Sequence, residues 1–175
     1  LYAAQHGTAW GAPFPVTFNG LFDAFGAYGG SGATLGLVIA LILFSKAKDQ
    51  KSIAKLSLAP GIFNINEMVI FGLPIILNPI YIIPFVLAPI VNIIIGYSAT
   101  CIFKIIPPVA YGVPWTTPGP LIPFLGTGGN VLALLIGVLC LAVSVLIYAP
   151  FVIAAGKASQ VDDDNSEKDT TEGLA

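Results

Sequence analysis

The stretch PGIFNINE, residues 60–67, decides the fold class because it interrupts an apolar run that continues on both sides of it. From Leu56 to Phe103 the one side chain that is charged at neutral pH is Glu67. Prolines also punctuate this run, at Pro60, Pro74, Pro79, Pro84 and Pro89. In hydrocarbon, broken backbone survives only where protein or a water-filled cavity satisfies its polar groups. We therefore expect residues 57–77 to form a re-entrant hairpin and residues 80–103 to cross the membrane.

A second apolar run repeats this arrangement between Ile105 and Gly156, which contains no charged side chain. It holds the proline-rich piece VPWTTPGP, residues 113–120, followed by a cleaner apolar segment at 130–151. An earlier uncharged run over residues 24–45 reaches the length of about 20 residues that a crossing helix needs. The sequence predicts an all-α membrane protein with about three transmembrane helices and two re-entrant hairpins.

The composition excludes several classes of protein. Hydrophobic residues make up 56% of the chain and charged residues 9%, with a mean hydropathy of +0.89. Soluble domains carry roughly 25% charged residues, so a water-soluble globule is excluded. A net charge of -2 and a pI near 5.1 are also unlike a nucleic-acid-binding protein, which shows a basic surface.

Three regions follow from charge and hydropathy. Residues 1–30 have aromatic side chains between glycines and prolines and are expected to be an interfacial amphipathic segment. Residues 31–156 are the membrane-embedded part, and residues 157–175 form an acidic tail that we expect to be disordered. The lysine-rich loop KAKDQKSIAK, residues 46–55, is expected to be cytoplasmic by the positive-inside rule, and so is the tail.

Glu67 is the most informative candidate for function. A carboxylate at membrane depth costs roughly 2.5 to 3.5 kcal/mol, and such residues usually face a cavity or a partner. Alternatively, Glu67 or Asn66 caps backbone amides at the broken tip of the hairpin. The amides of Asn64 and Asn66 suit hydroxylated ligands because each offers a donor and an acceptor, but asparagine also stabilises turns.

Trp115, Thr116 and Thr117 form the second candidate group. An indole face can stack on a sugar ring while neighbouring hydroxyls bind its polar rim. The alternative is a tryptophan of the interfacial aromatic belt. His6 is the one histidine of the chain, and a lone loop histidine is usually only solvated.

Other kinds of chemistry have little support in the sequence. Cys101 and Cys140 are isolated in apolar runs, so neither a CxxC pair nor a zinc site is expected, and no cofactor is implied. Phosphate-loop and hydrolase motifs are absent.

Paired, proline-interrupted apolar segments indicate a transporter's substrate site. An ion-coupled transporter with Glu67 as the ion or proton site remains an alternative, and so does a membrane subunit that only scaffolds a partner.

One resemblance is specific. PGIFNINE, then VIFGLPIILNPI (69–80), IPFVLAPIVN (83–92) and VPWTTPGPL (113–121), resemble the lactose/cellobiose type of enzyme IIC, the membrane permease of the bacterial phosphoenolpyruvate-dependent sugar phosphotransferase system. The resemblance covers nearly all of residues 1–156. It implies a homodimeric permease of roughly ten spans in the bacterial cell membrane, of which this chain is a carboxyl-terminal fragment.

The resemblance also implies roles for single residues. Glu67 corresponds to the glutamate that contacts the disaccharide near the hydroxyl that becomes phosphorylated, as a base or by positioning that hydroxyl, and Asn64 and Asn66 shape the same hairpin. The phosphoryl group is expected on a cysteine of the partner enzyme IIB. The family's sugar-binding histidine lies upstream, so its role is not transferred to His6. Met68 stands where the family motif has proline, which returns a backbone N–H to the turn.

Overall fold

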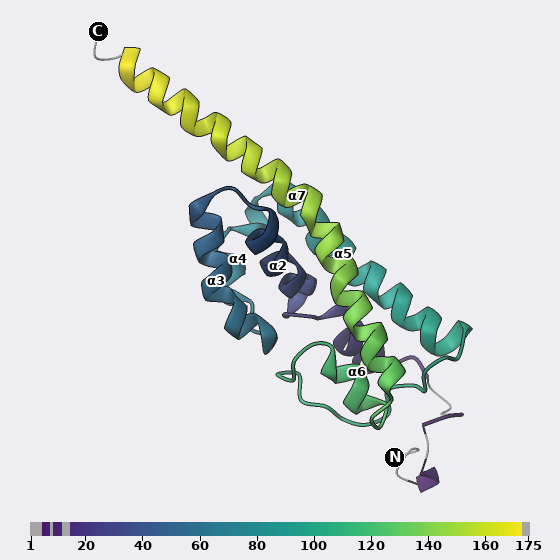
Figure 1. The fold of residues 1–175 in the computed structure, drawn as a ribbon. Helices are drawn as coiled ribbons and strands as arrows, with labels where there is room; N and C mark the ends of the chain where they lie inside the picture. Colours follow the sequence, from purple (N-terminus) through teal and green to yellow (C-terminus); the bar gives the residue numbers. More distant parts are fainter. Residues whose placement is uncertain (1–4, 8, 12–14, 173–175) are drawn as a thin grey trace.

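The structure is a computed structural model that describes residues 5–7, 9–11 and 15–172, with side chains as far as Lys157. Helices dominate these residues, and no strand occurs among them, so the predicted all-α class is confirmed. Figure 1 shows the helices gathered around α5 and α7. The α-helices are α2 (Thr34–Phe44), α3 (Lys48–Ile62), α4 (Glu67–Gly72), α5 (Pro79–Tyr97), α6 (Leu121–Gly126) and α7 (Val131–Glu172).

Three helical segments of the described chain are long and apolar enough to cross a membrane. They are Asn19–Phe44, Pro79–Ile102 and Val131–Lys157. The prediction of about three transmembrane helices is therefore confirmed. The second and third agree closely with the segments expected at 80–103 and 130–151.

The first of these segments is broken in the middle. It starts with the π-helix η1 (Asn19–Gly26) and continues through the short 3-10 helix η2 (Ser31–Ala33) into α2. Gly29 and Gly30, with φ of 78° and 89°, form the break. The segment thus begins inside residues 1–30. Phe25 is fully buried there, against Gly96 of α5, since a Cβ on that glycine would lie 2.5 Å from the phenyl ring.

The two later spans start with an asparagine cap. Oδ1 of Asn78 accepts a hydrogen bond of 2.9 Å from the N–H of Ile80, and Pro79 occupies the first position of α5. Oδ1 of Asn130 accepts one of the same length from the N–H of Leu132. These side chains satisfy N–H groups that have no partner within a helix, which is why the helices begin at these positions.

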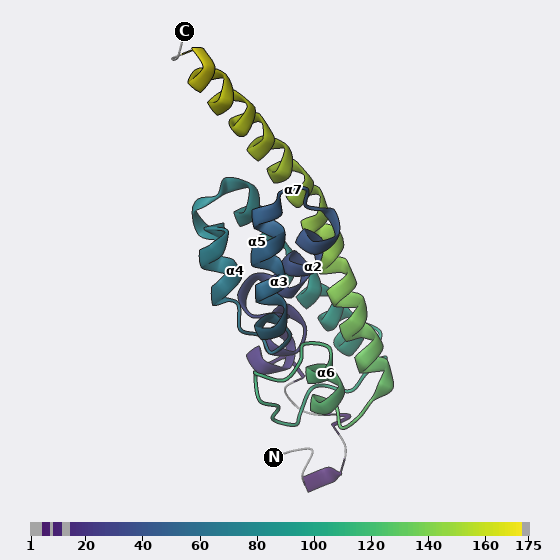
Figure 2. The same cartoon turned by 60° about the vertical axis from the view of Figure 1, so that its left-hand side comes forward.

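α3 and α4 form a helical hairpin beside the spans. α3 runs back alongside α2, and residues 63–66 connect it to α4 (Figures 1 and 2). Pro60 and Gly61 lie in the last turn of α3, and Asn64 follows with a left-handed φ of 63°. A helix cannot continue through that conformation, so the chain turns at Asn64.

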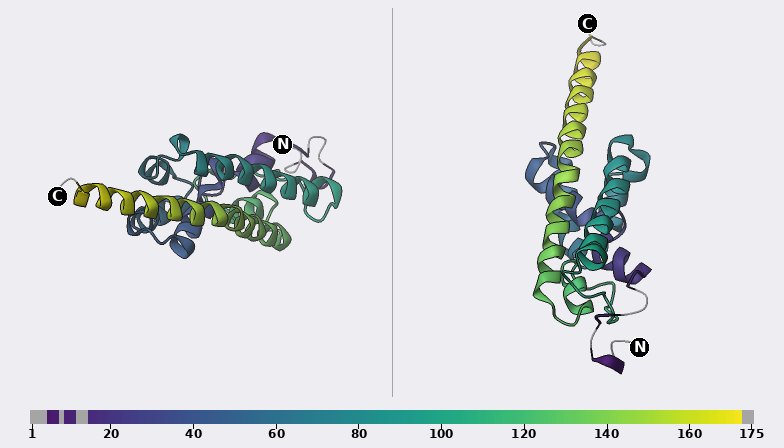
Figure 3. Two further views of the ribbon diagram at one scale, coloured as in Figure 1. Left: turned by 90° about the horizontal axis from the view of Figure 1, so that it is seen from above. Right: turned by 90° about the vertical axis from the view of Figure 1, so that its right-hand side faces the viewer.

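α5 packs against the part of α7 that precedes the projecting end (Figure 3). In their interface, Nδ2 of Asn92 donates a hydrogen bond of 2.8 Å to Oγ of Ser144, and both side chains are fully buried. Gly36 of α2 lies against the same serine. A Cβ at Gly36 would be 2.6 Å from Cβ of Ser144, so only glycine permits this distance between α2 and α7.

Replacing Gly36 with alanine is expected to lower the thermal midpoint of the protein by several degrees, because overpacking a tight contact costs about 1–3 kcal/mol. Thermal unfolding of the purified full protein that contains this sequence measures the effect. Gly112→Ala is the matched control, since a Cβ at Gly112 meets no atom within 4 Å. Equal midpoints for Gly36→Ala and the unmodified protein would contradict this packing.

The last helix continues beyond the third span. The backbone of α7 is helical up to Glu172, and Figure 1 shows this end extending beyond the other helices. Between Lys157 and Glu172 the sequence has neither proline nor glycine, and Gly173 follows. No residue that breaks a helix occurs in that stretch, and the disorder expected for residues 157–175 stays a prediction.

Candidate functional site

Three segments that are far apart in the sequence meet at the tip of the α3–α4 hairpin. They are the break in the first span at residues 27–31, the tip at 64–66, and the irregular piece 115–117 before α6. All or most of each segment lies outside the helices. Their backbone groups therefore need partners from outside their own helices, and side chains of the tip provide them.

Asn64 holds the three segments together. Its Oδ1 accepts a hydrogen bond of 2.8 Å from the N–H of Gly29, and its Nδ2 donates to the carbonyl oxygens of Trp115 and Thr117 at 2.6 Å and 2.9 Å. The side chain is 7% exposed. Both N–H groups of the amide are used in these bonds. Asn64 therefore links its own segment to two others, and its contact with a substrate stays a prediction.

Asn66 makes a second link from the tip to the break in the first span. Its Nδ2 donates a hydrogen bond of 3.0 Å to the carbonyl oxygen of Ser31. The backbone of Gly30 packs closely against this side chain, since a Cβ on Gly30 would lie 2.7 Å from Cγ of Asn66. With a φ of 89° as well, Gly30 allows both the close approach and the backbone turn.

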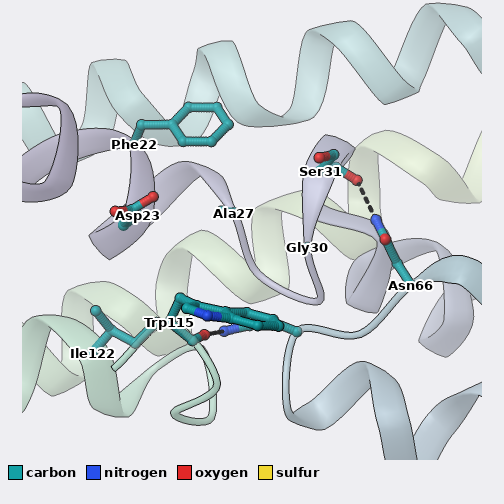
Figure 4. Close-up of a pocket in the computed structure, with 9 residues that line it drawn as sticks. Phe22, Asp23, Ala27, Gly30, Ser31, Asn66, Trp115 and Ile122 are labelled. Carbon is teal, nitrogen blue, oxygen red and sulfur yellow. Dashed lines mark hydrogen bonds between the residues drawn. The ribbon is translucent and has the colours of Figure 1, made fainter. Parts of the chain in front are cut away.

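A cavity of about 230 Å³ opens where these segments meet. Figure 4 shows the indole of Trp115 along one side of it and the linked Ser31 and Asn66 at another. The cavity combines an aromatic face, a carboxylate, an amide and a hydroxyl, which suits a small polyhydroxylated ligand. It is lined by Phe22, Asp23, Ala27, Gly30, Ser31, Asn64, Asn66, Trp115 and Ile122.

The structure brings three of the candidate side chains together at this cavity, Asn64, Asn66 and Trp115. Glu67, the first residue of α4, is exposed and has no hydrogen-bond or ion-pair partner within the part of the chain that the structure describes. Thr116 is exposed as well. Neither of the two is among the residues that line this cavity.

Asp23, Phe22 and Ser31 line the cavity and were missed in the sequence analysis. A signal for Asp23 existed: it is the last charged residue before the uncharged run 24–45. The depth argument applied to Glu67 therefore applies equally to Asp23. Ser31 had no such signal, because its place at the cavity depends on the contact between the break in the first span and the distant hairpin tip.

Metal ligands and thiols add little to the site. Within residues 5–7, 9–11 and 15–157, no group of three or more His, Cys, Asp or Glu side chains lies close enough to hold a metal ion. Cys140 is buried and Cys101 half-buried, and both are free thiols. His6 is exposed and is not part of the cavity lining.

Comparison with known proteins gives consistent matches. The family model described as "Phosphotransferase system, EIIC" matches residues 2–89. The cellobiose-specific EIIC component of Lactococcus lactis subsp. lactis is 49% identical over 146 residues, which are 83% of this chain and 29% of that protein. The lichenan permease IIC component of Bacillus subtilis is 40% identical over 130 residues, 74% of this chain and 29% of that protein.

A solved structure matches as well. The transporter ChbC, the IIC component of an N,N'-diacetylchitobiose-specific phosphotransferase system, superposes with a TM-score of 0.76 at 40% identity. The match covers 82% of this chain and 33% of that one. The chain thus spans about a third or less of the length of the relatives it matches.

Proposed function

Because the chain belongs to the EIIC family of the phosphotransferase system, we propose that it forms part of the disaccharide site of a sugar permease. The permease takes a disaccharide across the bacterial cell membrane and presents it to a phosphorylated IIB partner. The observation that carries this proposal is the cavity at the hairpin tip, where Asn64 joins three segments and Asn66 and Trp115 face the same space.

The class of substrate is supported by the names of the relatives. They are described as specific for cellobiose, oligo-β-mannoside and lactose, and the solved structure for N,N'-diacetylchitobiose. All of these are short oligosaccharides. In this chain, the indole of Trp115 stacks on a sugar ring, while Asp23, Ser31 and Asn66 bind hydroxyl groups.

Glu67 acts on the hydroxyl that receives the phosphoryl group. Glu67 lies next to Asn66 at the hairpin tip and is exposed without a partner in the described part of the chain. This supports a position facing sugar and the remainder of a longer permease, which supplies the opposite side of the site. The α3–α4 hairpin is proposed to re-enter the membrane, in a permease of roughly ten spans that works as a homodimer.

The transfer step requires a donor on another polypeptide or domain. The S–P bond of a phosphocysteine on IIB breaks, a P–O bond to the sugar hydroxyl forms, and the thiolate leaves. The proton of the hydroxyl passes to a base, for which Glu67 is the candidate if it comes within hydrogen-bond reach. Burial makes Cys140 unsuitable as a phosphoryl carrier, and Cys101 lies within the second span. One relative is named an EIICB component, which supports a IIB domain as the donor.

The orientation of the chain is proposed from the lysines. Lys46, after the first span, and Lys157, at the end of the third, line one cavity, so these two chain segments lie at the same end of the molecule. By the positive-inside rule, that end, with residues 46–55 and the segment after residue 157, faces the cytoplasm; residues 48–55 of the expected loop belong to α3.

The function is tested by sugar uptake into vesicles that contain the full protein. Phosphorylated cellobiose is expected to accumulate when phosphoenolpyruvate and the soluble components are supplied, and an ionophore is expected to have no effect. Accumulation of unmodified sugar that an ionophore abolishes would contradict this and restore the ion-coupled alternative, which the comparisons do not support.

Replacing Trp115 with phenylalanine is expected to weaken cellobiose binding about two- to tenfold, because a smaller ring stacks less well on a sugar. The fold is expected to survive, since Asn64 binds the backbone carbonyl of Trp115 rather than its side chain. Equilibrium binding of radiolabelled cellobiose measures the change. Trp10→Phe is the control, because Trp10 does not line this cavity. Unchanged affinity of the Trp115 variant would assign Trp115 to the interfacial belt instead.

A further inference from the structure

A second cavity, of about 290 Å³, lies at the opposite end of α2 from the hairpin tip. None of its lining residues belongs to the sugar cavity, so a role for this second cavity does not depend on the proposed function. It lies between the end of the first span and the end of the third. It is lined by Phe44, Lys46, Val152, Ile153, Gly156 and Lys157.

The position of this cavity relative to a membrane follows from hydropathy. The first apolar span ends at Phe44 and the third at Lys157, and both of these residues line the cavity. The ends of apolar spans lie where hydrocarbon gives way to headgroups. The cavity therefore lies at the depth at which lipid phosphates are found.

The lining has two chemically different parts. Lys46 and Lys157 are exposed and come from different chain segments, so two positive charges lie at one opening. Phe44 and Ile153 are 41% and 44% exposed, and Val152 is fully buried beside them. A ligand that fits this lining has an anionic group with an apolar part attached to it.

Gly156 keeps the space between these parts open. A Cβ added to this glycine would meet no atom within 4 Å. Gly156 is helical and its φ is not in the left-handed region, so neither the backbone nor a close contact requires glycine here. The absence of a side chain instead leaves room beside Lys157.

We propose that this cavity binds the phosphate headgroup of an anionic phospholipid of the surrounding leaflet. The two ammonium groups bind the phosphate, and the acyl chains lie along Phe44 and Ile153. Basic pockets between membrane helices favour anionic lipids, and lysines near a membrane surface each strengthen the attraction. A soluble phosphate would use the lysines but leave the adjoining apolar surface uncovered.

Native mass spectrometry of the full protein in detergent tests the proposal, with phosphatidylglycerol and phosphatidylcholine of the same acyl chains as probes. Lys46→Gln combined with Lys157→Gln is expected to weaken phosphatidylglycerol binding about 30-fold and to leave phosphatidylcholine binding unchanged. The matched control is Lys48→Gln with Lys55→Gln, which removes the same charge from α3 outside the cavity. The control is expected to retain the affinity.

A variant that fills the cavity with a larger side chain tests, independently of charge, whether the lipid binds in this cavity. Gly156→Leu is expected to reduce phosphatidylglycerol binding strongly, whereas Gly156→Ala, which adds only a Cβ, retains it. Normal binding by either Gly156→Leu or the Lys46/Lys157 variant would overturn the proposal. An equal loss in the Lys48/Lys55 control would also overturn it. Displacement of the lipid by inorganic phosphate at the concentrations at which the lipid itself binds would assign the cavity to a soluble phosphate instead.

Discussion

Replacing Asn64 with leucine is expected to abolish cellobiose binding and to lower the thermal midpoint of the full protein. Leucine has a similar size but cannot make the bonds to Gly29, Trp115 and Thr117. One N–H and two carbonyl groups would then lack these partners, and a buried polar group without a partner costs about 1–3 kcal/mol. Leucine is also strained at the φ of 63° that asparagine tolerates. Binding of radiolabelled sugar and thermal unfolding measure the two effects.

Asn64→Gly separates strain from hydrogen bonding. Glycine adopts a positive φ without cost but cannot make the three bonds. We expect this variant to lose sugar binding as well, with a smaller loss of thermal stability than the leucine variant. If Asn64→Leu kept both its affinity for cellobiose and its thermal midpoint, the joining of the three segments through Asn64 would be refuted.

Glu67→Gln is expected to lose activity but, unlike the Asn64 variants, to keep its thermal stability. Glutamine preserves the shape of the side chain and removes its charge. Because Glu67 is exposed and unpaired in the described part of the chain, nothing in the fold depends on that charge. Loss of a general base slows a reaction by about 10²- to 10⁴-fold. Phosphorylation of cellobiose with phosphoenolpyruvate and the soluble components measures the rate.

Asp49→Asn is the matched control for this experiment. Asp49 is another exposed acid in the first turn of a helix, α3, and it does not line the sugar cavity. It is expected to phosphorylate sugar at the normal rate. Near-normal phosphorylation by Glu67→Gln would remove Glu67 from the site. A lowered thermal midpoint would instead assign it a structural role as a cap.

The membrane spans were predictable because the property that defines them is local. Length and hydropathy along a continuous stretch were sufficient for 80–103 and 130–151, and two asparagine caps mark where these helices begin. The burial of Phe25 was not predictable. Aromatic residues near a membrane boundary also occur in interfacial belts, and only the contact with Gly96 distinguishes the two cases.

The candidate site was predictable only in part. A polar, proline-broken piece inside an apolar run identified Asn64, Asn66 and Trp115, but their roles depend on partners 35 to 53 residues away in the sequence. The sequence left Asn64 open between a ligand contact and a turn, and it gave no sign of the long-range bonds that Asn64 makes. Ser31 lacks any local signal, since it reaches the cavity through the close approach of Gly30 to Asn66.

Met68, which stands where the motif it resembles has proline, lies in the first turn of α4. Met68 is the second residue of α4, and N–H groups in the first turn of a helix have no partner within it. Proline is also tolerated at such positions. The structure therefore accommodates either residue, and the 47% exposed methionine side chain makes little difference to packing.

Protection of the cavity by sugar tests the central claim most directly. The experiment uses the full protein with its native cysteines, including Cys101 and Cys140, replaced by alanine. In this background, Ser31→Cys places an exposed thiol at the cavity and leaves the hydrogen bond from Asn66 to the backbone carbonyl of residue 31 unchanged. Saturating cellobiose is expected to slow its alkylation several-fold and to leave alkylation of Ser52→Cys, exposed on α3, unchanged. Equal alkylation rates at Ser31→Cys with and without cellobiose, lactose or N,N'-diacetylchitobiose would contradict a sugar site at this hairpin tip.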